Sequence, residues 1–163
     1  MAIRIFVTGG TFDKEYNELN GTLFFKETHV PEMLKLGRCE TSFEVRTIMM
    51  RDSLKMTETD RNLILENCKE EKEDKIIITH GTDTMVETAK FLQSRIKDKT
   101  IVLTGAMIPY RFGSSDGLFN LGVAVGFVKA LPHGVYIAMN GHCFKPDNVV
   151  KNRSIGKFEK IHP

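Results

Sequence analysis

The chain has 163 residues, 41% of them apolar, and its charged side chains nearly balance at a formal net charge of +2. This size and composition predict one globular domain, residues 1–163, with a single sizeable core. Basic residues are interleaved with acidic ones and form no patch, which argues against a nucleic-acid partner, and no stretch has the length and apolar character to cross a membrane.

The three cysteines, Cys39, Cys68 and Cys143, are odd in number and widely spaced, without a Cys-x-x-Cys pair. That pattern argues against a disulfide framework and against structural zinc. The first residues contain no positive region ahead of a long apolar stretch, so they predict a first strand in place of a targeting segment. We therefore expect a cytoplasmic protein.

The first part of the chain alternates strand-like and helix-like segments. Residues 3–7 predict a short strand that ends at the glycine-containing turn TGGT, residues 8–11. Residues 13–28 predict a hairpin that turns at Asn20-Gly21 and forms a flap beside this first turn. Three further elements follow, namely a short helix from Pro31 to about Gly37, a strand over 43–50, and a helix capped by Thr57 with Asp60.

A second polar turn lies at the centre of the sequence. The apolar run 76–78 predicts a strand, and Met85, Ala89, Leu92 and Ile96 recur at helical spacing after it. Thr84 with Glu87 predicts a capping box that starts this helix. Thr82 and Asp83 then lie in the turn, at the carboxyl end of a strand, where open α/β sheets bind their ligands. The alternative is that both residues only cap the helix.

The remaining elements complete an α/β pattern. Residues 100–104 and 135–139 predict two more strands, and residues 118–131 predict a helix capped by Asp116. Because that helix is apolar on nearly all sides, we expect it to be buried against the sheet or against a partner chain. Five strands alternating with helices predict a mostly parallel sheet with helices on both faces.

Two of the predicted turns carry residues suited to nucleophilic chemistry. Thr11 follows the first strand and Thr82 follows the central one, while Asp83 and Lys151 supply charged partners. A threonine hydroxyl is a weak nucleophile at neutral pH and needs a neighbouring base, such as a lysine with a lowered pKa. The combination indicates an activated hydroxyl.

Four ordered motifs extend this interpretation: TGGT at 8–11, HGTDTM at 80–85, GAM at 105–107, and SDG at 115–117 followed by Asn-Leu at 120–121. Together they resemble the bacterial-type L-asparaginases, in the family's order and at similar spacing. Asp52-Ser53 also looks like that family's substrate-binding segment, and Lys151 falls where the family carries its catalytic lysine. The resemblance covers essentially the whole chain.

The resemblance implies a three-layer, Rossmann- or flavodoxin-like α/β fold with its active site at the carboxyl ends of the strands. It implies hydrolysis of L-asparagine to L-aspartate and ammonia through an acyl-enzyme, with no cofactor and no metal. By the same resemblance Thr11 is the nucleophile and Tyr16 its activator. The other implied roles are a second catalytic group of Thr82, Asp83 and Lys151, substrate α-amino binding by Asp83, α-carboxylate binding by Ser53, and a backbone contact from Ala106.

The sequence also departs from the family pattern. Family members usually continue into a second domain, which supplies a glutamate to a neighbouring subunit, whereas the sequence here runs to Pro163. We therefore expect a short, single-domain member that forms a homodimer or homotetramer. Leu54 and Lys55 replace polar and acidic residues of the family, and Glu15 or Glu18 can stand in for the absent glutamate.

Other functions stay open at this point. One is hydrolysis of glutamine or of a related amide, because one methylene changes substrate discrimination by only about 1 to 3 kcal/mol. Another is a non-catalytic module that binds an amino acid. A nucleotide site is disfavoured because the first turn lacks Gly-x-Gly-x-x-Gly spacing, and a tRNA-linked substrate is disfavoured by the balanced charge. The five histidines, His29, His80, His133, His142 and His162, form no helical metal-binding pair.

Overall fold

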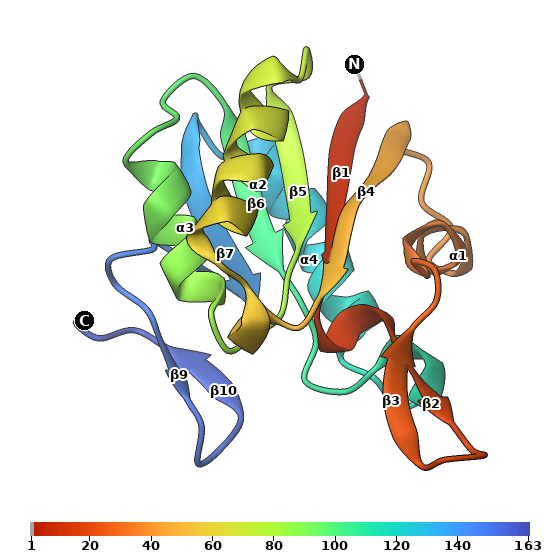
Figure 1. Ribbon diagram of the computed structural model, residues 1–163. Coiled ribbons are helices and arrows are strands. Elements are labelled where there is room, and N and C mark those ends of the chain that lie inside the picture. The colour runs from red at the N-terminus through yellow and green to blue at the C-terminus, as the bar shows by residue number, and fades with distance from the viewer. Residues whose placement is uncertain (1) are drawn as a thin grey trace.

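A central sheet organises the computed structural model, which describes residues 2–163 (Figure 1). Its strand order is β4-β1-β5-β6-β7-β8. The strands are β1 (Ile3–Gly9), β4 (Phe43–Arg51), β5 (Lys75–Thr79), β6 (Thr100–Thr104), β7 (Gly134–Met139) and β8 (His142–Phe144). Neighbours from β4 to β7 are parallel, and β8 is antiparallel to β7. The predicted mostly parallel α/β sheet is confirmed, and each of the five predicted strands is present.

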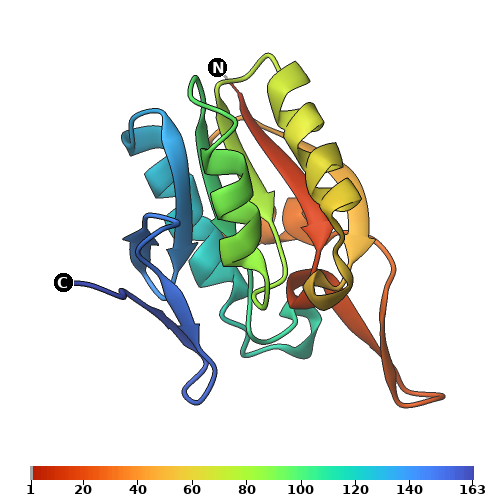
Figure 2. The same ribbon diagram turned by 60° about the vertical axis from the view of Figure 1, so that its left-hand side comes forward.

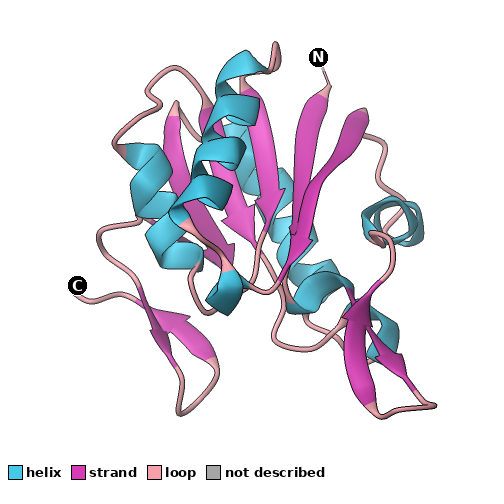
Figure 3. Ribbon diagram, in the orientation of Figure 1, coloured by secondary structure: helices cyan, strands magenta, loops and turns pink. Residues whose placement is uncertain are grey.

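Helices cover both faces of this sheet, as Figures 2 and 3 show. Helices α2 (Glu58–Glu70) and α3 (Met85–Gln93) pack on one face, and α1 (Val30–Leu36) and α4 (Gly117–Ala130) pack on the other. A hydrophobic core lies on each face of the sheet. Successive residues of β5 contribute alternately to these two cores, because strand side chains alternate between faces. Ile76 and Ile78 join the α2–α3 side, while Ile77 joins the α1–α4 side.

Two small hairpins stand outside the sheet. The first, β2 (Lys14–Asn17) with β3 (Thr22–Phe25), is the hairpin predicted around Asn20-Gly21. The second, β9 (Val150–Asn152) with β10 (Lys157–Glu159), was not predicted, and neither was β8. These strands are only three residues long, which is too short for a period-two pattern to be distinguished from a polar loop.

The strand order contains a switch point between β1 and β5. The chain runs from β1 outward to β4, whereas the later connections run from β5 in the opposite direction, to β6 and β7. Loops leaving β1 and β5 therefore depart in opposite directions across the sheet. In open α/β sheets this switch point is where ligands bind, at the carboxyl ends of the strands.

The three predicted helix caps have different outcomes. At α2 the capping box is present, since the Thr57 hydroxyl accepts from Asp60 N and the Asp60 carboxylate accepts from Thr57 N. The capping box predicted at Thr84 is wrong: α3 does begin after Thr84, but the Thr84 hydroxyl donates to Ser53 O at 2.9 Å. The Thr84 side chain therefore bonds to an acceptor in another part of the fold, whereas the local sequence pattern predicts a bond to its own helix.

Asp116 makes a similar departure at α4. It occupies the cap position, yet its carboxylate accepts from Met107 N and Ile108 N, at 2.9 and 3.0 Å, and so fastens the preceding loop. Helix α4 packs on the sheet through Leu121, Ala124 and Val128, as expected. No helix within residues 2–163 combines the length and apolar character that a membrane crossing requires.

Candidate active site

Four turns pack closely against one another at the carboxyl edge of the sheet. Gly10, at φ +76°, lies against Gly81, so that a Cβ on Gly10 would be 2.4 Å from Gly81 Cα. Gly81 in turn lies against Ser53, and a Cβ on Gly105 would be 2.3 Å from His80 O. Glycine is needed because no side chain fits these approaches. The loops after β1, β4, β5 and β6 therefore converge.

This convergence places the two predicted threonines on adjoining turns. Thr11 directly follows Gly10 and opens a 3-10 turn, and Thr82 directly follows Gly81. The ends of the two strands are also tied by a hydrogen bond of 2.7 Å from the Thr8 hydroxyl to Thr79 O. Thr11 is half-buried and Thr82 is buried. The two hydroxyl-bearing residues thus flank the switch point between β1 and β5.

Lys151 reaches this place from the C-terminal hairpin. Its Nζ donates to Thr82 Oγ1 at 2.7 Å and to Asp83 Oδ1 at 2.9 Å. The Lys151 side chain is only 11% exposed, so its charge is poorly hydrated and depends on these partners. The hydrogen bond from Lys151 lowers the pKa of Asp83, and the Arg153 charge acts in the same direction. The structure therefore brings Thr82, Asp83 and Lys151 together.

Arg153 is a further member that the sequence did not predict. Its Nη1 donates to Asp83 Oδ1 at 2.5 Å, so Asp83 is bound by two cations. The Arg153 side chain is 63% exposed and lies at the rim of the cluster. The available signal was only proximity, since Arg153 is two residues from Lys151 and opens the turn of the same hairpin.

Ser53 and Ala106 lie next to these turns. Ser53 is buried against Gly81 and directly precedes Leu54 and Lys55, which are both exposed. Ala106 is buried beside Gly105, whose carbonyl accepts from Asn120 Nδ2 at 2.9 Å. Both residues are therefore held rigidly near the converging turns.

Tyr16 has a different position. It lies on the outer hairpin, 55% exposed, with its ring edge-on to Phe112 at 6.4 Å between centroids. Within residues 2–163 no hydrogen bond or ring contact joins Tyr16 to Thr11. The neighbouring Glu15 turns toward His29 Nε2 and Arg111 Nε, at 4.0 and 3.7 Å.

His80 supports the central turn from below. Its ring is fully buried, Nδ1 lies 2.7 Å from Gly81 O, and Nε2 lies 2.8 Å from Thr88 Oγ1. A carbonyl only accepts, so Nδ1 carries the proton and Nε2 accepts from Thr88. Burial lowers the pKa of His80 to about 4. His80 is therefore neutral in the folded protein and stabilises the turn that contains Gly81.

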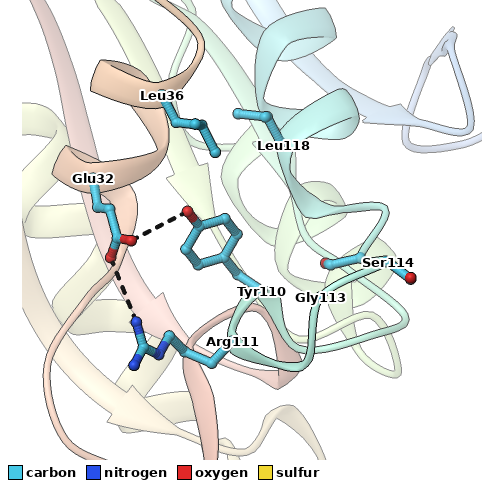
Figure 4. Close-up of a pocket in the computed structure, with 8 residues that line it drawn as sticks. Glu32, Leu36, Tyr110, Arg111, Gly113, Ser114 and Leu118 are labelled. Atoms are coloured by element: carbon cyan, nitrogen blue, oxygen red, sulfur yellow. Dashed lines mark hydrogen bonds and ion pairs between the residues drawn. The ribbon is translucent and has the colours of Figure 1, made fainter.

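A separate groove of about 430 Å³ lies between α1 and the 3-10 turn Tyr110–Phe112 (Figure 4). Glu32 projects across it, accepting from Tyr110 Oη at 3.4 Å and pairing with Arg111 Nη1 at 3.9 Å. None of the predicted site residues lines it. In the part of the chain that the structure describes, no three His, Cys, Asp or Glu side chains are grouped to hold a metal ion.

The arrangement of these turns matches a known family. A family model described as asparaginase, N-terminal, matches residues 2–159. The chain belongs to the asparaginase family. Among curated asparaginases, L-asparaginase of Thermococcus kodakarensis is 29% identical across 99% of this chain and 52% of the relative. L-asparaginase 2 of Escherichia coli is 44% identical over 91 residues, 53% of this chain and 24% of the relative.

Solved asparaginase structures share the fold. The thermostable L-asparaginase of Thermococcus kodakarensis has a TM-score of 0.88 at 29% identity, covering 100% of this chain and 52% of the other. A probable cytoplasmic L-asparaginase of Campylobacter jejuni has a TM-score of 0.83 at 33% identity, covering 99% and 53%. The chain therefore spans about half the length of these asparaginases.

The close approach of the turns leads to a first prediction. Gly10→Ala should lower the free energy of unfolding by about 2 kcal/mol or more, because the new Cβ meets backbone and the φ is positive. Gly122→Ala is the matched control, since nothing lies within 4 Å of its Cβ position and it should stabilise α4 by about 0.5–1 kcal/mol. Urea unfolding measures both. Equal effects would show that the turns are not in contact.

His80 generates a second prediction. Its pKa is about 4 in the fold against 6.5 unfolded, so the unfolded chain binds the additional proton between these values. Stability is then complete above pH 6.5 and decreases as the pH falls toward 4, by up to about 3 kcal/mol. Urea unfolding at several pH values tests this, and His80→Asn should flatten that part of the profile. A ring titration near 6.5, followed by NMR in the wild type, would contradict it.

Proposed function

We propose that this chain forms the catalytic turns of an amidohydrolase that converts L-asparagine and water to L-aspartate and ammonia. The observation that carries the proposal is the contact of Lys151 Nζ with Thr82 Oγ1 and Asp83 Oδ1, beside the turn that bears Thr11. A mostly covered lysine held to a threonine and a carboxylate is suited to proton transfer to and from a hydroxyl. Family membership supports the same reaction.

In the proposed reaction Thr11 Oγ attacks the side-chain amide carbon and its proton leaves to a base. The tetrahedral adduct collapses, the C–N bond breaks, and ammonia departs with the added proton, which leaves an ester on Thr11. Water then attacks the ester carbon, releases aspartate and returns the proton to Thr11. We assign the proton transfers to Lys151, with Thr82 as its hydroxyl partner and Asp83 stabilising the protonated amine.

Substrate contacts are proposed from the same turns. Asp83 takes the α-ammonium group, Ser53 the α-carboxylate, and the Ala106 backbone the side-chain amide. The support is position, since Ser53 lies against Gly81 and Ala106 lies beside Gly105. Tyr16 acts as the activator of Thr11 only if the outer hairpin moves inward, because its ring lies against Phe112.

A second candidate is a module that binds an amino acid without turnover. One observation favours it: the Asp83 carboxylate is already bound by Arg153. Glutamine in place of asparagine is a variant of the first candidate. No cofactor or metal is required by either.

We also propose the wider setting of the site. Residues 1–163 are taken as one domain of the asparaginase N-terminal type, and the protein as a cytoplasmic homodimer or homotetramer without nucleic-acid or membrane partners. The free cysteines and the similarity to the probable cytoplasmic L-asparaginase of Campylobacter jejuni support this location.

A third prediction tests the activity. Purified chain should release ammonia from L-asparagine, and Thr11→Ala, Thr82→Ala and Lys151→Met should each lower the rate by about 100-fold or more, because each removes a group that transfers a proton or forms the ester. Lys160→Met is the matched control, being an exposed lysine of the same tail. Circular dichroism checks that each variant is folded.

The same samples separate the two candidates. If folded wild-type chain releases no ammonia from asparagine or glutamine, yet binds aspartate in calorimetry, the binding module is the better assignment. If neither amide is hydrolysed and aspartate does not bind, both candidates are wrong for this chain. Wild-type turnover in any one variant removes that residue from the mechanism.

A further inference from the structure

Strand β4 leaves one edge of the sheet open. It is the outermost strand, as Figure 3 shows, and within the described residues 2–163 it pairs only with β1. Ile3 N donates to Ser42 O at 3.0 Å, and Ile3 lies opposite Phe43. Since alternate residues of a strand direct both backbone polar groups to the same side, Glu44 and Arg46 bond to β1. The N–H and C=O groups of Phe43, Val45 and Thr47 therefore point to the open edge.

The regular part of this edge is short and well defined. Val7 pairs with Thr47, but the next matched pair is Gly9 with Arg51, so β4 bulges after Thr47. A bulge interrupts the ladder and twists the strand away. Regular pairing at the open edge is thus limited to residues 43–47, and the middle of that segment is Val45.

The side chains of this segment carry opposite charges on one face. Glu44 and Arg46 are two residues apart, and both are exposed. The Glu44 carboxylate is bound on the inner side by Arg4 Nη2 at 2.5 Å but keeps 58% of its side chain exposed. Among residues 2–163, no hydrogen bond or ion pair engages the Arg46 side chain. The edge therefore presents an acidic residue and an unpaired basic one.

We propose that β4 pairs antiparallel with β4 of a second copy of this chain, about a two-fold axis at Val45. In this register the Val45 N–H and C=O bond to those of the partner's Val45, and Phe43 bonds to Thr47 of the partner subunit. Glu44 then lies opposite Arg46 of the partner subunit, twice by symmetry. Each such opposite-charge pair across neighbouring strands is attractive.

Other registers are disfavoured by the same residues. A shift that moves the axis to Glu44 places two glutamates opposite each other, and a shift to Arg46 places two arginines opposite each other, which is repulsive. An axis midway between two residues would match outward groups with groups already bonded to β1. Charges on an edge strand usually prevent pairing with other chains. In β4, these charges disfavour the two like-charged registers and favour the register with its axis at Val45.

A second copy fits this edge better than it fits the exposed outer face of α4. The outer face of α4 exposes Phe119 beside Gly122, but nothing there selects a partner or an orientation. The β4 edge supplies both hydrogen bonds and a self-complementary charge pattern. A contact of five residues per subunit is small, so the dimer should dissociate on dilution.

Sedimentation velocity over a dilution series tests the proposal on the 163-residue chain, without reference to activity. Wild type should show a monomer–dimer equilibrium. Arg46→Glu should weaken dimerisation by about tenfold or more, because two attractive pairs become repulsive. Glu44→Arg combined with Arg46→Glu should restore it. Wild type that stays monomeric at every concentration overturns the proposal, and so does a dimer that Arg46→Glu leaves unchanged.

A backbone variant checks the edge independently of Arg4, which the change at Glu44 also affects. Thr47→Pro removes an N–H that points outward and bonds nothing in β1. The fold should therefore tolerate proline at this edge position, while dimerisation should be lost. Thr47→Ala is the matched control, because it keeps that N–H and should dimerise like wild type. Equal dimerisation of the two variants places the interface elsewhere and overturns the proposal.

Discussion

The close approach of Gly10 to Gly81 is the constraint on which the site depends. It joins the turn after β1 to the turn after β5, two strands that are neighbours in the sheet but far apart along the chain. Because backbone meets backbone there, the residues that follow each glycine are held in fixed relative positions. The threonines at 11 and 82 are positioned by this contact and not by their own side chains.

Charged side chains add to the arrangement that the turns establish. Lys151 enters from a hairpin outside the main sheet and bonds to Thr82 and Asp83, residues 69 and 68 positions earlier. With Arg153 also on Asp83, one carboxylate holds two cations. Such a cluster has excess positive charge, which suits a substrate or product that carries carboxylates. The turns that carry Thr11 and Thr82 are therefore next to a positively charged cluster.

Much of this could be predicted from the sequence, because apolar runs and glycine turns are local signals. The five parallel strands and the grouping of Thr82, Asp83 and Lys151 follow from such patterns together with the family motifs. The functions of Thr84 and Asp116 could not be predicted, since each side chain leaves its helix for a partner that only the tertiary fold provides. Arg153 was missed because the hairpin that carries it is too short to recognise.

Hairpin β9–β10 has a consequence for how the fold and the site respond to stress. It is attached by Val149 and Phe158 at the margin of one core, by a hydrogen bond from Phe158 N to Asn140 Oδ1 at 2.8 Å, and by the bonds of Lys151 and Arg153 to the central turn, whereas the sheet has two full cores. Elements with few anchors open locally at a lower free energy than the whole domain. Mild heat or denaturant would then detach Lys151 while the sheet persists, so the site would be lost before global melting begins.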